Sequence, residues 1–259
     1  MTQYIRSPRA HILRLLAFST LCLGSYANAL DSKQLESTLE AQGLSTKVAL
    51  TQDSGLQGLS FVVVEQEGGL WIPLLANDSG KIALGISQNL IFTTDENFKA
   101  KLETLLQKVS LNNKQIVDKG VLEVFKQHPN STITITNKAA KYTTYIVLDP
   151  NCPYCRAEVE KLEEYAKDST LKIMVVGIIE QSSINKAAAF AKLIQDAKTK
   201  NEQISVLKKV FNKSFDPSSV RFDEATEQGN ISSTLLIMGL KLRKAGLQGV
   251  PHIIKEPIK

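Results

Sequence analysis

The stretch Leu148–Val159 has the sequence LDPNCPYCRAEV and carries two of the three cysteines of the chain. An apolar, β-rich run precedes it, and a charged run with helical spacing follows it. The short segment Asp149–Asn151 between them predicts a strand, a tight turn and a helix that begins beside the first cysteine. Two cysteines placed in this way can form a reactive dithiol, half of a metal site or a small structural disulfide.

The position of Cys152 favours the reactive dithiol. We expect Asn151 to cap the helix, so that Cys152 lies in the first turn, where free backbone N–H groups and the helix dipole stabilise an anion. The thiolate is the nucleophile of disulfide exchange. Pro153 is tolerated there because the N–H that it lacks has no partner in a first turn. Cys155 follows one turn later and can attack a mixed disulfide formed at Cys152.

The two other interpretations fit the sequence less well. A structural zinc ion usually needs four ligands, and after residue 29 the only other candidates of the Cys/His type are His128 and His252, in no zinc-finger spacing. A disulfide that closes so short a loop adds little stability. The sequence therefore predicts redox chemistry at Cys152 and Cys155, with no metal ion and no cofactor beyond the cysteine pair.

Residues 1–29 have the composition of a secretory signal peptide. They contain three arginines and no acidic residue, followed by the apolar run 15–23 and by small residues at Ala27 and Ala29. The apolar run is shorter than the ~20 residues that a membrane span needs. We therefore expect export of the protein and cleavage after Ala29, which would also remove Cys22.

The charge of the mature chain is small. Removal of residues 1–29 lowers the net charge from +5 to +2, because three arginines leave and no acidic residue does. Such a charge gives no electrostatic argument for a nucleic-acid or membrane partner. The content of 43% hydrophobic and 22% charged residues is typical of a globular protein.

Residues 30–93 are expected to form a small α+β domain. A helix is predicted over residues 31–42, and four strands separated by turn residues are predicted over 47–51, 59–66, 70–76 and 81–86. A unit of roughly 60 residues is marginally stable alone. Pairing with a second copy would stabilise it, so we predict a dimerisation domain in preference to a monomeric domain that faces the substrate.

Residues 94–128 are predicted to form a helical linker. Thr93 and Glu96 are spaced as a capping box, and Asn112-Asn113 is expected to interrupt the helix before Pro129 ends it. One apolar stripe is predicted from residues at helical spacing: Phe98, Leu102, Leu105 and Val109.

Residues 129–259 alternate between predicted strands and helices, which is typical of an α/β layout with late helical insertions. The predicted strands cover residues 132–136, 143–148, 171–179 and 252–255. The predicted helices cover residues 156–167, 184–198, 202–212 and 224–245. The third strand is apolar except for Lys172, as expected of a buried parallel strand.

The segment Asp149–Cys155 (DPNCPYC) resembles the active site of the DsbC/DsbG family, periplasmic thiol:disulfide interchange proteins of the thioredoxin superfamily. Gly249-Val250-Pro251 is similar to the cis-proline loop of that superfamily. The resemblance extends over the mature chain. It implies an α+β protein with a cystatin-like N-terminal dimerisation domain, a helical linker and a C-terminal thioredoxin fold with inserted helices.

The resemblance also implies a function and partners. Cys152 would be the nucleophile and Cys155 the resolving thiol of a homodimeric periplasmic oxidoreductase that forms or isomerises disulfide bonds. The residues implied to contact the client are Pro153, Tyr154, Val250 and Pro251. The partners would be exported proteins with cysteines and a membrane redox protein, either a DsbB-like oxidase or a DsbD-like reductase.

Two features depart from the family pattern. Family isomerases have Thr before the cis-proline, whereas this chain has Val250, as in DsbA-type oxidases; this difference favours oxidation over isomerisation. Only eight residues follow Pro251. The usual last strand and closing helix are therefore not expected, and residues 252–255 are predicted to form an edge strand.

Two polar residues near the cysteines are weaker candidates. Thioredoxin and DsbA carry a buried acid six positions before the first cysteine, where this chain has Ile146. Asp149 could assist proton transfer instead, but we expect it to be an exposed turn residue. His252 could lie near the sulfurs, although on a strand it is expected to point elsewhere.

An alternative of another class is a non-enzymatic chaperone or binding protein with an incidental cysteine pair. In that case Cys152→Ala would leave the protection of clients intact.

Overall fold

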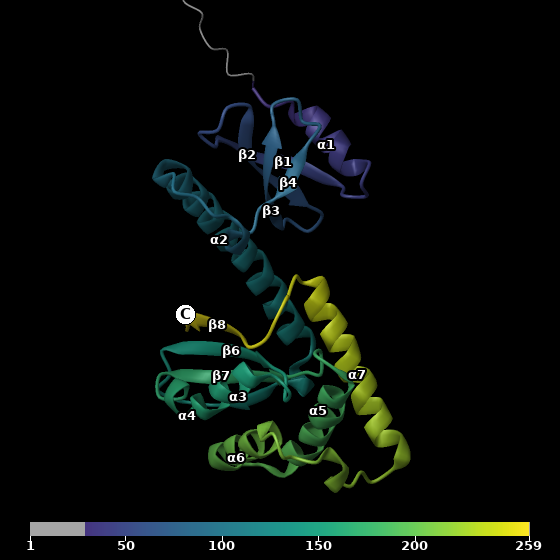
Figure 1. Ribbon diagram of the computed structural model, residues 1–259. Helices are drawn as coiled ribbons and strands as arrows, with labels where there is room; N and C mark the ends of the chain where they lie inside the picture. The colour runs from purple at the N-terminus through teal and green to yellow at the C-terminus, as the bar shows by residue number, and fades with distance from the viewer. Residues whose placement is uncertain (1–28, 259) are drawn as a thin grey trace, which may run out of the picture.

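The computed structural model describes residues 29–258, which form two units joined by a long helix (Figure 1). The α+β architecture predicted from the sequence is confirmed: an antiparallel sheet, a long helix, and a mixed sheet with inserted helices. Residues 1–28 and 259 lie outside the described part, and with them most of the expected signal peptide and Cys22. Over residues 29–258, no helix is long and apolar enough to cross a bilayer.

The N-terminal unit is one helix packed on a four-stranded meander. The helix α1 (Ser32–Glu40) is capped by Asp31, whose side chain accepts the N–H of Gln34 at 3.0 Å. The antiparallel strands lie in chain order: β1 (Thr46–Asp53), β2 (Leu59–Gln66), β3 (Trp71–Asn77) and β4 (Ala83–Gly85). Gly80 lies in the turn before β4 with φ +67°, and a Cβ there would come within 2.5 Å of the Asp31 carbonyl oxygen. Only glycine fits this approach.

Strand β2 is buried on both faces. Its side chains alternate between the two faces of the sheet, and a helix covers each face. Val62 and Val64 pack with α1. Phe61 and Val63 pack on the opposite face against helix α2 (Glu96–Gln127). The predicted apolar stripe supplies the helix side of this second core: Phe98, Leu102, Leu105 and Val109.

The predicted break at Asn112-Asn113 is wrong, since α2 continues for 32 residues. The two amides bind the start of β3 instead. The Asn113 side chain accepts the N–H of Trp71 at 2.7 Å and donates to its carbonyl at 2.9 Å, while Asn112 donates to the carbonyl of Gly69 at 3.1 Å. These tertiary hydrogen bonds outweigh the low helix propensity of asparagine.

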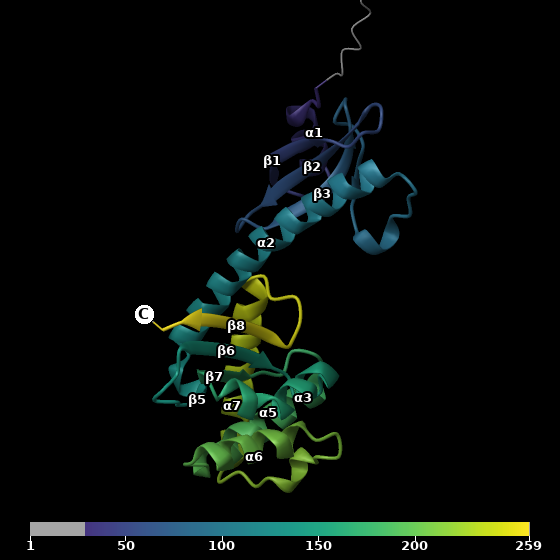
Figure 2. The ribbon, with the colours of Figure 1, turned by 90° about the vertical axis from the view of Figure 1, so that its left-hand side faces the viewer.

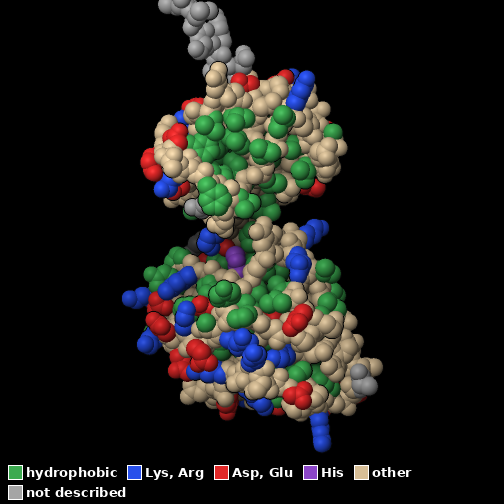
Figure 3. Space-filling view, viewed as in Figure 1, with side chains coloured by type: hydrophobic (Ala, Val, Ile, Leu, Met, Phe, Trp, Pro, Cys, Tyr) green, Lys and Arg blue, Asp and Glu red, His purple; other side chains and the backbone are tan. Residues whose placement is uncertain are grey.

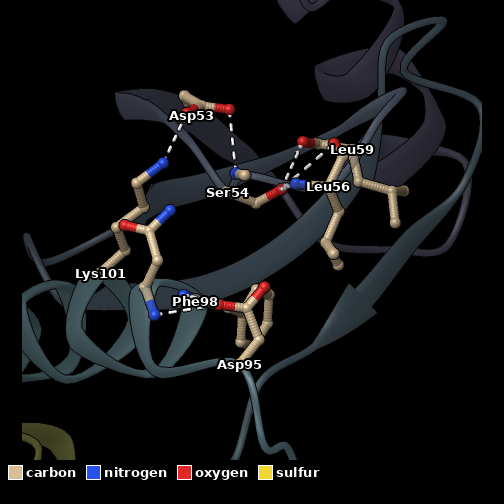
Figure 4. A network of polar contacts seen from close by, with 9 residues as sticks. Asp53, Ser54, Leu56, Leu59, Asp95, Phe98 and Lys101 are labelled. Atoms are coloured by element: carbon tan, nitrogen blue, oxygen red, sulfur yellow. Dashed lines mark hydrogen bonds and ion pairs between the residues drawn. The ribbon is translucent and has the colours of Figure 1, made fainter.

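The predicted capping box at the start of α2 is also wrong. Asp95 is the N-cap, and its carboxylate accepts the N–H groups of Asn97 and Phe98 at 2.9 and 3.0 Å (Figure 4). One turn further along, Lys101 lies 2.6 Å from the Asp53 carboxylate at the end of β1. The first turns of α2 are thus fixed to the sheet by polar contacts as well as by the apolar stripe.

The C-terminal unit is built on a second sheet with the order β5-β7-β6-β8. Its strands are β5 (Ile133–Ile135), β6 (Tyr142–Leu148), β7 (Ser169–Val175) and β8 (His252–Pro257). Only β6 and β7 run parallel, and β7 is largely buried, as predicted. Strand β8 lies at one edge of the sheet, as expected.

The helices of this unit lie in the connection between β6 and β7 and in the long connection between β7 and β8. The α-helices are α3 (Pro153–Glu160), α4 (Leu162–Tyr165), α5 (Gln181–Leu193), α6 (Lys200–Phe211) and α7 (Ala225–Lys244). Short 3₁₀ turns are η1 (Gln88–Leu90), η2 (Pro129–Ser131), η3 (Ile194–Asp196) and η4 (Pro217–Ser219). The single helix predicted over 156–167 is split, because α3 ends at Glu160 and Lys161 separates it from α4.

Helix α2 runs from the upper unit to the lower one in both ribbon views (Figures 1 and 2). Its C-terminal half places Val121, Val124 and Phe125 in the core of the C-terminal unit. Phe125 packs edge-on against Tyr145 of β6, with the ring centroids 5.2 Å apart. One helix therefore contributes buried side chains to both units.

Candidate functional site

The cysteine pair lies where β6 passes through a short turn into α3. Cys152 is itself the N-cap of α3, and its sulfur accepts the N–H of Cys155 at 3.4 Å. The predicted cap, Asn151, is wrong: its side-chain amide donates to Glu180 and Ser182 instead, at 2.7 and 2.5 Å. Pro153 lies in the first turn, as predicted, where it is the first helical residue. The nucleophile candidate thus faces the N–H groups at the helix start directly, where a negative charge is stabilised.

The second predicted motif lies directly against the first. The peptide bond between Val250 and Pro251 is cis. The Cys152 thiol donates to the Val250 carbonyl oxygen, with a distance of 3.2 Å between the sulfur and oxygen atoms, although the two residues are 98 positions apart. The structure therefore brings together the cysteine pair and the Val250-Pro251 loop.

Cys152 is largely covered in the free chain, although its place at the start of a helix would suit an exposed sulfur. Both cysteines are free thiols; Cys152 is 4% exposed and Cys155 is fully buried. Tyr154, between them, is 76% exposed.

The two sulfurs have different surroundings. Burial raises the pKa of the Cys155 thiol, and the N–H of Asp149, which points at its sulfur from 3.4 Å, opposes this rise only in part. Cys155 is therefore protonated at neutral pH in the dithiol form. A buried thiol next to a helix-capping thiol suits the division into an attacking sulfur and a resolving sulfur.

Asp149 is fully buried, so the prediction of an exposed turn residue is wrong. One carboxylate oxygen accepts the N–H of Asn151 at 2.9 Å. The other accepts the N–H groups of Ile178 and Ile179 at 2.8 and 3.1 Å. The carboxylate ties the cysteine turn to the segment after β7, a contact that local sequence does not reveal.

The remaining candidates lie apart from the sulfurs. Ile146 is buried in β6. His252 points towards α2, where its Nε2 lies 2.9 Å from an Asp118 carboxylate oxygen, in agreement with the expectation that it points elsewhere. Among residues 29–258 there is no group of three or more His, Cys, Asp or Glu side chains that could hold a metal ion.

Sequence reasoning missed an apolar groove beside the cysteine turn. It has a volume of about 210 Å³ and lies between the segment after β7 and helix α7. Ile179, Leu236 and Leu240 line it with exposed side chains, and Arg243 closes one end by donating to the Ile178 carbonyl at 2.6 Å. These residues are far apart in the sequence and show no common pattern.

A dithiol at the start of a helix, beside a cis-proline loop and on a mixed sheet, defines a thioredoxin-like thiol protein. Residues 35–121 match the family described as the N-terminal domain of the disulfide isomerase DsbG. This part of the chain is therefore similar to the N-terminal domain of DsbG, and the fold and cysteine pair of the C-terminal unit are those of a DsbG-like thiol:disulfide oxidoreductase.

One solved structure extends the comparison beyond residues 35–121. Helicobacter pylori DsbG is 26% identical, with a TM-score of 0.50, over 86% of this chain and 100% of its own. A linker-deletion mutant of Proteus mirabilis ScsC is 20% identical, with a TM-score of 0.40, over 65% of this chain and 88% of its own. Pseudomonas aeruginosa DsbA2 is 13% identical, with a TM-score of 0.38, over 48% of this chain and 79% of its own. No curated protein sequence matched the chain.

Proposed function

We propose that this protein forms and isomerises disulfide bonds in exported client proteins of the periplasm, and that oxidation is the favoured direction. Cys152 is the nucleophile and Cys155 the resolving thiol. The observation that carries the proposal is the Cys152 sulfur, which caps α3, accepts the N–H of Cys155 and lies 3.2 Å from the Val250 carbonyl oxygen.

In the oxidising direction, a client thiolate attacks the Cys152 sulfur of the Cys152–Cys155 disulfide. The bond between the two cysteines breaks, and Cys155 leaves as a thiolate that takes up a proton. A second client thiolate then attacks the client sulfur bound to Cys152 and releases Cys152. Two electrons pass from the client to the cysteine pair, and a DsbB-like membrane oxidase would remove them. In isomerisation the Cys152 thiolate attacks a client disulfide, and another client thiol displaces it.

The residues around the sulfurs support contact with an extended client segment. Tyr154 is exposed beside Cys152, and Pro153 precedes it in the first turn of α3. Val250 and Pro251 form the opposite wall. The aliphatic side chain of Val250 offers the nucleophilic sulfur no hydroxyl hydrogen bond, which is the basis for favouring oxidation over isomerisation.

The experiment that tests this function is equilibration of the purified protein with glutathione buffers of graded potential. We expect Cys152 and Cys155 to form a disulfide reversibly as a two-electron couple, and the oxidised form to oxidise a two-cysteine peptide. Alkylation of the thiols in intact cells then gives the direction: a pair that is mostly disulfide supports oxidation, and a pair that is mostly dithiol supports isomerisation with a DsbD-like reductase. A Cys152→Ala variant that protects clients as well as the native protein would favour the chaperone alternative.

We also propose that the N-terminal unit joins two copies of the chain. Strand β4 is an edge strand of its sheet, and free edges favour association. Large apolar side chains are exposed on this strand and on either side of it in the chain: Ile82, Leu84, Leu90 and Phe92. Figure 3 shows a broad green patch on the N-terminal unit, whereas charged side chains are frequent on the C-terminal unit below it. Contiguous apolar surface of this kind marks an interaction site.

Substitutions in this surface should separate the two copies. Phe92, which is 91% exposed, and Leu84 can be replaced together as Phe92→Glu and Leu84→Lys. Since buried charges oppose association, we expect sedimentation velocity to show a monomer for this variant and a dimer for the native protein. Ile237→Glu, at an exposed apolar position on α7, is the control and should remain dimeric. A native protein that sediments as a monomer would refute the proposed dimer.

A further inference from the structure

We propose that His252 is a positioning residue that ties the client-contacting Val250-Pro251 loop to helix α2. The proposal rests on the proposed function and adds to it the way in which the loop is held against Cys152. His252 is the first residue of β8 and follows Pro251 directly.

The tie consists of a half-buried pair of side chains. His252 Nε2 lies 2.9 Å from Asp118 Oδ1, and each of the two side chains is 19% exposed. Lys114, one turn earlier in α2, lies 2.5 Å from the other carboxylate oxygen of Asp118. Because a carboxylate can only accept, Nε2 carries the proton of this bond. Asp118 is thus held from both sides and provides a fixed anchor on α2.

His252 is only two positions away from the residue that contacts the reacting sulfur. That residue is Val250, whose carbonyl oxygen accepts a hydrogen bond from the Cys152 thiol. Between them lies Pro251, whose ring fixes its φ angle. In addition, His252 is paired with Val147 of β6, the strand that leads to the cysteines. A displacement of His252 would therefore be transmitted to the Val250 carbonyl.

The other end of the segment also lies against α2. Gly246 has φ +91°, and a Cβ at this position would lie 3.0 Å from Val117 of α2 and 3.3 Å from Leu70 beside β3. Gly246 therefore packs closely on α2, and His252 contacts the same helix through Asp118. Both ends of the segment from Gly246 to His252 thus lie against the helix that also contributes to the core of the N-terminal unit.

The geometry distinguishes this role from acid–base chemistry. The His252 ring is directed at Asp118, while the contacts of the Cys152 sulfur are made by Val250 and Cys155. His252 is therefore expected to affect the binding of the client and not proton transfer.

The test compares His252→Ala and Asp118→Ala with Asp118→Asn, which keeps an acceptor oxygen for His252. The control is His128→Ala, since His128 contacts Lys241 and not the loop. We expect the KM for a two-cysteine peptide to rise on the order of 10-fold in both alanine variants, with kcat within about twofold of the native value. A role in stability alone would reduce the active fraction and lower kcat at constant KM. Asp118→Asn and His128→Ala should keep the native KM.

A second readout does not depend on client turnover. In a Cys155→Ser background, iodoacetamide should alkylate Cys152 several-fold faster when His252 is replaced by alanine, because the loop no longer covers the sulfur. Asp118→Ala should give the same increase, and it tests the tie even if His252→Ala fails to fold. Native KM and alkylation rate in both alanine variants, or equal changes in His128→Ala, would overturn the proposal. A native protein that oxidises no peptide would instead refute the proposed function, and alkylation would still decide on the tie.

Discussion

Replacing Cys155 with serine should leave the reduced protein covalently joined to clients that contain a disulfide. The Cys152 thiolate attacks the client disulfide, its sulfur–sulfur bond breaks, and the second client sulfur leaves and is protonated. In the native protein, Cys155 lies one helical turn away, with its N–H already bonded to the Cys152 sulfur. Cys155 can therefore attack the mixed disulfide intramolecularly and release the client.

The effect should be large because an intramolecular attack has a high effective concentration. Reactive groups held in place reach effective molarities of about 10⁵ M or more, so release by millimolar external thiol should be slower by at least about 1,000-fold. Non-reducing electrophoresis and mass spectrometry of the intact adduct measure the trapped complex. Cys152→Ser should form no adduct. Equal adduct formation by native protein and Cys155→Ser, or an adduct in Cys152→Ser, would contradict the assigned order of the two sulfurs.

The second large effect is expected for Asp149→Asn, through stability. The Asp149 carboxylate is buried and accepts three backbone N–H groups, two of them on one oxygen. An amide has one acceptor oxygen, so it can keep the bonds to Ile178 and Ile179 only if its NH₂ group faces the N–H of Asn151. A buried donor left without an acceptor costs about 1–3 kcal/mol, and a neutral acceptor is weaker than a carboxylate, so the free energy of unfolding should fall by roughly 2–4 kcal/mol. Urea denaturation measures this difference.

Asp216 offers a matched control. Its carboxylate accepts the N–H of Ser218, also two residues later and also at 2.9 Å, but Asp216 is exposed. Asp216→Asn should therefore change the free energy of unfolding by less than about 1 kcal/mol. Similar losses at the two positions would show that the buried contacts of Asp149 with the segment after β7 contribute little.

The sequence was sufficient for the features that depend on local pattern. The strand over residues 59–66, the apolar stripe of α2 and the strand–turn–helix around Cys152 follow from the local pattern, and the structure confirms each of them. The cysteine pair and the Val250-Pro251 loop lie about 100 positions apart, and local pattern does not relate them. Only their resemblance to two motifs of one protein superfamily indicated that both belong to the site.

The errors arise where distant backbone groups decide the outcome. Asn112 and Asn113 have low helix propensity, but the hairpin around Trp71 supplies hydrogen bonds that only the folded chain brings into reach. Asp149 follows an apolar strand as a turn residue often does, and its burial depends on N–H groups some 30 positions later. The low exposure of Cys152 has the same origin, because the loop that covers it lies near the end of the chain.

Helix α2 also affects how the molecule unfolds. Its first half completes one hydrophobic core and its second half another, so neither core keeps all of its buried side chains if the helix melts at either end. The boundaries predicted near residues 93 and 128 would each leave one unit without part of its packing. Heat or denaturant should therefore disrupt the two units together, in a single cooperative transition, and neither should survive as an independent fragment without the shared helix.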